Sequence, residues 1–197
     1  MNDLTTIAVF CGANAGAQPV YLDGARAMGA ELGRRRLGLV YGGGSVGLMG
    51  MVARAVRDQG CRVVGVIPDS LTTKELMGQK VGDLIVVETM HERKAVMASM
   101  ADAFIAMPGG FGTLDELFEV ITWGQLGLHV KPIGLFNVGG YFDPLVAFID
   151  HAVTEGFIRL HHRGLFVVEN DPARLLDQLT AHQAPPGLVA YDGLDRI

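Results

Sequence analysis

The 197-residue chain is poor in cysteine and has no excess of positive charge. Its two cysteines, Cys11 and Cys61, have no CxxC spacing, so the sequence predicts neither a disulfide framework nor a zinc site. Lysine and arginine total 16 against 21 aspartates and glutamates, which gives a net charge of -5. This balance offers no general attraction to the phosphates of DNA or RNA, and we expect no nucleic-acid partner.

Membrane-spanning and export segments are also missing from the pattern. The longest uncharged stretch runs from Leu37 to Ala53, but the triplet Gly42 to Gly44 interrupts it, which indicates a strand, a turn and a helix. The chain opens with Asn2 and Asp3 rather than with a basic segment, so we expect a cytoplasmic protein that does not bind membranes. Because the histidines form no ligand motif, we expect no metal ion.

Glycine and apolar residues are abundant, with 27 glycines and 49% apolar residues. Short apolar runs alternate with longer amphipathic stretches, which is the pattern of βα units around a mostly parallel sheet. We therefore predict an α/β fold, with a doubly wound, mostly parallel seven-stranded sheet and helices on both faces. A single domain is expected over residues 1–180, followed by an irregular tail over residues 181–197. The predicted strands are 7–11, 38–41, 62–67, 84–87, 103–107, 132–136 and 165–168, and the predicted helices are 20–35, 47–59, 90–100, 113–126, 144–155 and 172–179.

Ligands of doubly wound sheets bind outside the carboxyl ends of the strands, so the turns that follow strands are the candidate sites. The first glycine-rich turn follows the second predicted strand and satisfies G-x-G-x-x-G at Gly42, Gly44 and Gly47. With Asp69 as a ribose-binding acid, this turn keeps open a nicotinamide-dependent oxidoreductase. The alternative is a tight turn whose glycines only let helix and strand pack closely.

The second glycine-rich turn, Pro108 to Thr113, opens a predicted helix. Its glycines would expose backbone N–H donors, and the Thr113 hydroxyl could add one more bond to a phosphate oxygen. Thr113 and Glu116 could instead form a capping box that only closes the helix end. If a phosphate binds here, the Glu116 carboxylate should face a group that becomes positive, such as an oxocarbenium-like ribose.

The third motif, Met90 to Lys94, begins another predicted helix. Arg93 and Lys94 oppose the helix dipole there unless an anion compensates, which indicates an anionic ligand. The alternative is a solvated charge cluster in which Glu92 pairs locally.

These motifs resemble the LONELY GUY family of cytokinin riboside 5'-monophosphate phosphoribohydrolases. The likeness rests on Gly42 to Gly50, Met90 to Ala95 and Pro108 to Glu116, and it continues through Glu119 to Trp123 and Lys131-Pro132, so that it covers roughly residues 5–180. Asp115 stands where relatives commonly have Glu, and Phe111 where many have Tyr or Leu. Both changes are mild.

The resemblance implies a Rossmann-like fold and a homodimer with the active site at the dimer interface. It implies hydrolysis of the N-glycosidic bond of AMP or N6-isopentenyl-AMP to the free base and ribose 5-phosphate, with no metal or organic cofactor. Arg93 and Glu116 match the catalytic pair of the family. Residues that match nucleotide-binding positions, or that we expect in the same pocket, are Glu75, Lys94, Gly109, Gly110, Phe111, Gly112, Thr113, Leu114, Asp115, Thr122, Gly43, Gly44 and Ser45.

Two other interpretations stay open, and the nicotinamide-dependent oxidoreductase described above is the second of them. Related Rossmann-like proteins with a Pro-Gly-Gly turn carry the molybdenum cofactor without cleaving it, so a non-catalytic nucleotide or molybdenum-cofactor carrier is the first alternative. The presence of both Arg93 and Glu116 favours the hydrolase over the carrier. Similar proteins have often been labelled lysine decarboxylases, but nothing in the sequence suggests a pyridoxal phosphate site.

Overall fold

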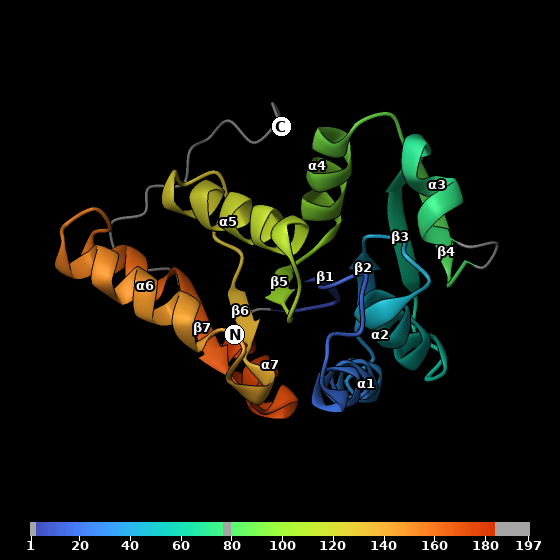
Figure 1. Ribbon diagram of the computed structural model, residues 1–197, viewed down its shortest axis with the longest axis horizontal. Coiled ribbons are helices and arrows are strands. Elements are labelled where there is room, and N and C mark those ends of the chain that lie inside the picture. Colours follow the sequence, from blue (N-terminus) through green and yellow to red (C-terminus); the bar gives the residue numbers. More distant parts are fainter. Residues whose placement is uncertain (1–2, 77–79, 184–197) are drawn as a thin grey trace.

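Seven parallel strands form one sheet at the centre of the molecule (Figure 1). The computed structural model describes residues 3–76 and 80–183, without the side chains of residues 73–76. The strand order is β4-β3-β2-β1-β5-β6-β7, and all neighbours are parallel. The strands are β1 (Thr6–Phe10), β2 (Gly38–Tyr41), β3 (Val63–Pro68), β4 (Asp83–Val87), β5 (Ala103–Ala106), β6 (Ile133–Phe136) and β7 (Phe166–Glu169).

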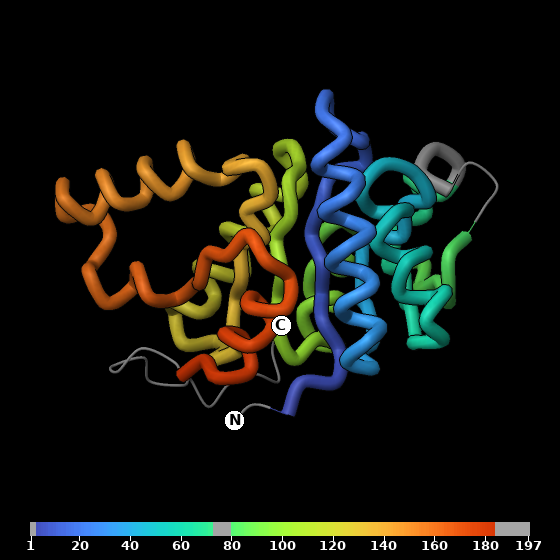
Figure 2. The backbone as a smooth tube through the Cα atoms, turned by 90° about the horizontal axis from the view of Figure 1, so that it is seen from below, coloured from blue at the N-terminus to red at the C-terminus, as the bar shows by residue number. Residues whose placement is uncertain are grey.

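Each face of the sheet is covered by helices, because alternate side chains of the buried strands point to opposite sides. Ile7 and Val9 of β1 belong to the core beneath α1 (Pro19–Arg34), α2 (Gly47–Arg57) and α7 (Pro172–Ala181). Ala8 and Phe10 belong to the core beneath α4 (Met90–Met100), α5 (Phe111–Gln125) and α6 (Asp143–Thr154). Figure 2 shows the first of these helical layers, with α1 running along the sheet. The predicted doubly wound α/β fold is thus confirmed.

The strand bounds differ from the predicted ones by no more than one residue, but the helices bring two corrections. The helix α3 (Asp69–Leu76) was not predicted, because it lacks a clear apolar stripe and so gives no periodic signal. The helix α5 begins at Phe111, two residues before the predicted start at Thr113. Short 3-10 turns, η1 (Val138–Gly140) and η2 (Leu160–Leu165), precede α6 and β7. The predicted tail lies largely outside the described residues, although Ala181 still ends α7.

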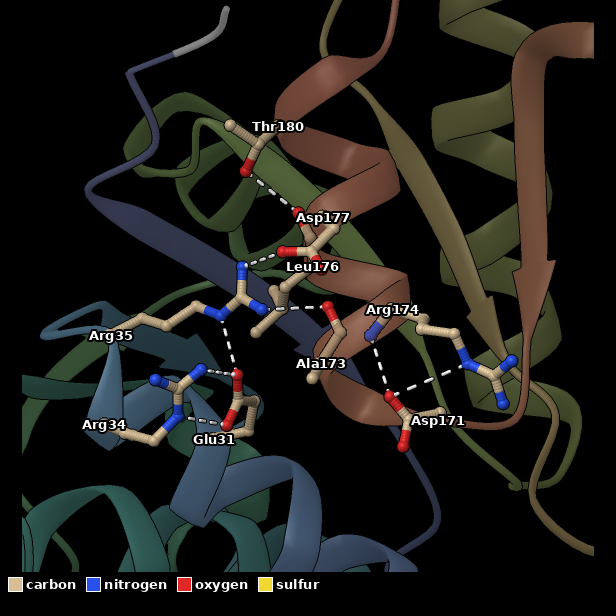
Figure 3. A network of polar contacts seen from close by, with 9 residues as sticks. All are labelled: Glu31, Arg34, Arg35, Asp171, Ala173, Arg174, Leu176, Asp177 and Thr180. Carbon is tan, nitrogen blue, oxygen red and sulfur yellow. Dashed lines mark hydrogen bonds and ion pairs between the residues drawn. The ribbon is translucent and has the colours of Figure 1, made fainter.

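An ion-pair network joins the end of α1 to α7, as Figure 3 shows. The guanidinium of Arg35 contacts Glu31 of α1 and Asp177 of α7, both at 2.7 Å, and it also donates to the carbonyl of Ala173 at 2.9 Å. Hydrogen bonds from Arg34 and Arg35 outweigh burial and lower the pKa of Glu31 to about 2. These contacts connect the C-terminal end of α1 to α7, which lies on the same face of the sheet.

The chain order reverses between β1 and β5, which is the switch point where doubly wound folds bind ligands. Two turns meet there. The amide of Gly12, after β1, donates to the carbonyl of Pro108, after β5, at 3.0 Å. No described helix is both long and apolar enough to cross a membrane.

Candidate active site

A cavity of about 560 Å³ opens at the switch point. Its walls come from the turns after β1, β2 and β5, from the first turns of α4 and α5, and from the segment after η1. Residues Gly12 to Gly16 and Pro108 to Gly110 contribute to its lining. The polar side chains that reach it include Arg93, Thr113 and Glu116. Apolar side chains, among them Leu48, Met49, Leu71 and Met90, form the remaining walls.

The Pro-Gly-Gly turn is built to bring backbone close to a ligand. A Cβ atom on Gly109 would lie 2.1 Å from the Thr113 hydroxyl oxygen, so only glycine fits there. Cβ atoms on Gly110 and Gly112 would meet nothing within 4 Å, which shows that the start of α5 is open on this side. The N-cap residue Gly110 makes no side-chain cap bond. The first amides of α5 can therefore bind an anion, as helix N-termini do.

The capping-box alternative for Thr113 and Glu116 is wrong. A capping box needs its hydroxyl at the N-cap and its carboxylate three residues later. Because α5 begins at Phe111, Thr113 is already the third helical residue and Glu116 lies one turn deeper. Both side chains are buried against the cavity instead of covering the helix end.

Arg93 and Glu116 meet inside the cavity although 23 positions separate them in the chain. The Nη2 atom of Arg93 lies 3.7 Å from Oε1 of Glu116, and the two side chains are only 7% and 10% exposed. The same Nη2 donates to the carbonyl of Gly42 at 3.2 Å, whereas Nε of Arg93 is buried without a hydrogen-bond partner. The solvated-cluster alternative is therefore wrong for Arg93. The carboxylate of Glu92 accepts a hydrogen bond from the Glu88 backbone amide at 2.8 Å, which is not an ion pair.

The pair places a buried carboxylate beside a fixed positive charge. A separation of 3.7 Å exceeds a direct hydrogen bond, so the guanidinium acts on Glu116 mainly through its charge, which is strong at a site shielded from water. The thiol of Cys11 also lines the cavity, and burial together with the nearby Glu116 carboxylate raises its pKa well above the usual range. The thiol therefore stays protonated and is a poor nucleophile.

The first glycine-rich turn contributes less to the cavity than the sequence suggested. Only Gly42 of this turn lines the cavity, whereas Gly43, Gly44 and Ser45 are buried elsewhere. Gly43 has a φ of +81° and turns toward β3, where its Cα would lie 2.8 Å from a Cβ on Gly65. These three residues therefore lie outside the cavity lining of the single chain, and their place in the nucleotide pocket stays a prediction.

The same turn does not fit the dinucleotide interpretation. The amides of Leu48 and Met49, at the start of α2, donate to the carbonyl of Gly12 at 3.1 and 3.3 Å. These are groups that a bound pyrophosphate would need. Asp69 begins α3 beyond β3, and it does not line the cavity.

The residues matched to nucleotide binding fall into two groups. Gly109, Gly110, Gly112 and Thr113 line the cavity with Arg93 and Glu116. Phe111, Leu114, Asp115 and Thr122 instead line a shallow hollow on the outer face of α5. Glu75 falls in α3, and its side chain lies outside the described residues.

Lys94 belongs to the outer group. Its Nζ atom contacts Glu119 at 2.9 Å and Asp115 at 3.1 Å. Although burial lowers the pKa of Lys94, the bonds to Glu119 and Asp115 outweigh it and raise this pKa. The lysine therefore joins α4 to α5 beside the hollow.

Sequence reasoning missed several residues that line the cavity. Asn14 lies in the turn after β1, Tyr21 on α1, Leu71 on the unpredicted α3, and Tyr141 after η1. The position of the first and last of these after strands was an available signal, because such turns converge on the ligand. Among the described residues, no group of three or more histidines, cysteines, aspartates or glutamates could hold a metal ion.

Comparison with known proteins adds close relatives. A family model described as "possible lysine decarboxylase" matches residues 49–179. The chain is 50% identical over 195 residues to cytokinin riboside 5'-monophosphate phosphoribohydrolase LOG7 of Arabidopsis thaliana, covering 97% of this chain and 90% of the relative. It is 53% identical over 173 residues to the probable cytokinin riboside 5'-monophosphate phosphoribohydrolase LOGL2 of Oryza sativa subsp. japonica, covering 88% and 71%.

Solved structures share the architecture at lower identity. The molybdenum cofactor carrier protein of Chlamydomonas reinhardtii superposes with a TM-score of 0.66 at 21% identity, over 90% of this chain and 99% of that protein. The molybdenum cofactor binding protein of Rippkaea orientalis gives the same TM-score at 20% identity, over 90% and 96%. At this identity the likeness concerns the fold alone.

Proposed function

Because the chain belongs to the LONELY GUY family of cytokinin riboside 5'-monophosphate phosphoribohydrolases, we propose that it hydrolyses the N-glycosidic bond of an adenosine 5'-monophosphate. The products are a free adenine-type base and ribose 5-phosphate. The observation that carries the proposal is the buried pair of Arg93 and Glu116, 3.7 Å apart and beside the open N-terminus of α5.

Phosphate binding at the start of α5 anchors the substrate. The amides after Gly109 and the hydroxyl of Thr113 offer donors at the positive end of the helix dipole. Glu116, one turn further along α5, then faces the ribose rather than the phosphate. Binding energy gained at the phosphate, remote from the reacting bond, holds the ribose in place for reaction.

Glu116 acts on the bond that breaks. As the C1'–N9 bond lengthens, its electron pair leaves with the base and positive charge grows on the ribose ring, where a nearby carboxylate stabilises it. Water then adds to C1' and gives its proton to the carboxylate, which passes this proton on to the departing base and so returns to its starting state. Arg93 holds the Glu116 side chain and contributes positive charge toward the hydroxyl and phosphate oxygens of the nucleotide.

The cavity suits a purine on its apolar side. Leu48, Met49, Leu71 and Met90 offer contacts for the base and for an apolar substituent at N6. Both AMP and N6-isopentenyl-AMP are therefore candidate substrates, and the ratio of their rates ranks them.

The proposal includes a homodimer that packs through the outer face of α5. Exposed residues recur along this face at helical spacing, with Phe111 92%, Phe118 39% and Leu126 59% exposed. The matched binding residues Lys94, Asp115 and Thr122 lie on or beside this face, away from the cavity with Arg93 and Glu116. A partner subunit would bring the two groups together at one interface.

A pyridoxal phosphate enzyme, as the words "possible lysine decarboxylase" suggest, does not fit these residues. Such an enzyme binds its cofactor through a lysine Schiff base. None of the described residues that line the cavity is a lysine, and Nζ of Lys94 is held by Glu119 and Asp115. A non-catalytic carrier remains the second candidate, favoured only by the fold shared with the molybdenum cofactor proteins.

Chromatography of the reaction products tests the proposal. The wild-type protein is incubated with a chelator and with AMP or N6-isopentenyl-AMP, next to Glu116→Gln and, as a control, Glu155→Gln at the exposed position that follows α6. We expect free base from the wild type and the control, and a loss of kcat of at least about 100-fold in Glu116→Gln with the nucleotide still bound. Nucleotide binding without release of base from the wild type would instead identify a carrier.

A further inference from the structure

Tyr141 reaches the cavity from a turn that none of the sequence motifs contains. It follows η1, after β6, and its hydroxyl donates a hydrogen bond of 2.5 Å to the carbonyl oxygen of Gly109. Gly109 lies in the turn after β5, 32 positions earlier in the chain. The bond therefore ties one strand-to-helix turn to the turn from which we expect the phosphate-binding amides.

The position of the Tyr141 hydroxyl is fixed from several sides. Gly139 and Gly140 both have positive φ, at 62° and 70°, and they turn the chain sharply before it. The next residue, Phe142, is 1% exposed, and its amide donates to Oδ1 of Asn137 at 2.7 Å. The Tyr141 ring lies edge-on to the rings of Phe142 and Tyr21, at 5.2 and 5.8 Å between centroids. A side chain held in this way can hold another group in turn.

The hydrogen bond orients a whole peptide unit. The described chain has no cis peptide bond, so the Gly109 carbonyl and the Gly110 amide point in opposite directions from one rigid plane. The carbonyl of Pro108, one residue earlier, is held in a similar way by the Gly12 amide at 3.0 Å. Glycines have the greatest backbone freedom, so a turn of two glycines needs such outside bonds to keep one orientation.

We propose that Tyr141 is a positioning residue for the phosphate subsite: its hydroxyl fixes the Gly109–Gly110 peptide so that the amides at the start of α5 face the phosphate. The inference rests on the proposed function, because it assigns the start of α5 to the 5'-phosphate. Tyr141 acts through the Gly109 carbonyl and takes no part in bond cleavage. Its effect should therefore be confined to the ribose phosphate half of the substrate.

Separate binding measurements for the two halves of the substrate test this. Isothermal titration of wild type and Tyr141→Phe with ribose 5-phosphate and with adenine needs no turnover, so the result does not depend on whether the wild type hydrolyses nucleotides. We expect Kd for ribose 5-phosphate to rise about tenfold in Tyr141→Phe, as loss of one ordering hydrogen bond would give. Kd for adenine should stay within about twofold.

Tyr41→Phe is the matched control. Its hydroxyl also donates to a backbone carbonyl, that of Val81 at 3.2 Å, but in the core and away from the cavity lining. This variant should leave both Kd values unchanged. Equal weakening of adenine and ribose 5-phosphate in Tyr141→Phe would overturn the proposal, and so would no weakening of either.

Amide NMR of the ligand-free protein separates positioning from direct contact. We expect the Gly110 amide resonance to move in Tyr141→Phe and to stay in place in Tyr41→Phe. If affinity for ribose 5-phosphate falls while this resonance stays unchanged, the hydroxyl binds the ligand itself and the positioning role is wrong.

Discussion

A Cβ atom on Gly42 would lie 2.0 Å from Nη2 of Arg93, so the arginine occupies the space that any larger residue at position 42 would need. The same nitrogen donates to the Gly42 carbonyl at 3.2 Å. The sequence predicts Gly42 as part of a phosphate-binding loop. In the structure, Gly42 instead leaves room for the Arg93 guanidinium, which faces Glu116, and accepts a hydrogen bond from it.

Gly42→Ala should therefore impair catalysis by displacing Arg93. A shift of about 1 Å in a reacting group can cost about 100-fold in rate, and we expect kcat/KM for AMP to fall by at least that factor. Steady-state release of base measures the change. Gly38→Ala, at the other end of β2, is the control, because its Cβ would meet neighbours only at ordinary distances of 3.5 Å and beyond. Normal rates in Gly42→Ala would show that Arg93 is not needed in this position.

The outer face of α5 should hold the subunits together. Phe118→Asp places a charge in the apolar stripe of α5, and we expect it to convert a dimer to monomers, with a loss of kcat/KM of at least about tenfold. Sedimentation velocity measures the assembly. Phe157→Asp is the control, because Phe157 is 88% exposed but follows α6, outside this face. A monomeric wild type, or a dimeric Phe118→Asp, would contradict the assignment of this face.

His129 should make folding sensitive to mild acid. Its Nε2 contacts the Val120 carbonyl at 2.8 Å, and its Nδ1 accepts from the Lys131 amide at 3.1 Å. Burial, helped by the charge of Lys131, lowers its pKa although the bond to Val120 opposes this shift. Protonation would also turn Nδ1 into a donor that faces another donor.

The direction in which pH changes the free energy of unfolding follows from the protons bound by the folded and unfolded states. A lowered pKa means that the unfolded chain binds the proton first, so the contribution of His129 is fully present above about pH 6.5 and is lost as pH falls toward the folded pKa. In that window the free energy of unfolding should drop by up to about 1.4 kcal/mol for each pH unit. Urea unfolding of wild type and His129→Gln at about pH 8 and pH 5.5 measures it. His162 and His182, whose pKa values are also lowered, remain in both proteins, so an equal drop in the two would contradict the prediction.

The two cysteines should differ in reactivity. Burial and the Glu116 carboxylate raise the pKa of Cys11, so its thiol is protonated and shielded, whereas Cys61 is partly exposed. We expect iodoacetamide to modify native Cys61→Ser, which retains Cys11, at least about tenfold more slowly than Cys11→Ser. Mass spectrometry after a timed reaction measures both. The two unfolded variants are the control and should react at equal rates. Equal rates also in the two native variants would contradict the burial of Cys11.

Individual strands and helices show which parts of the fold can be predicted from the sequence. The strands were predicted to within one residue because each is a short, mostly apolar run, and the inner ones are buried on both faces, whereas the edge strands β4 and β7 are partly exposed. Their parallel arrangement followed from the helices between them. The helix α3 was not predicted because it has only a weak apolar stripe. The start of α5 was predicted two residues late because its N-cap residue, Gly110, has no side chain that would mark a helix start.

The candidate site also has features that the local sequence predicted and features that it did not. Sequence motifs identified Arg93, Glu116 and the Pro-Gly-Gly turn. Cations at a helix N-terminus and consecutive glycines are locally unusual, so they can be recognised in the sequence alone. Whether Thr113 and Glu116 capped a helix or faced a ligand depended on a shift of two residues in the start of α5, which no local pattern fixed.

The sequence by itself determined the α/β fold, the strand positions and the candidate residues to which we assign nucleotide cleavage, because periodicity and unusual local charge do not depend on distant contacts. Only the tertiary structure decided which of those residues meet. It joined Arg93 to Glu116, turned Gly43 away from the cavity and brought Tyr141 to Gly109, because these contacts link separate turns through the register of the strands. Such distances are set by packing of the whole sheet, which no single segment of sequence contains.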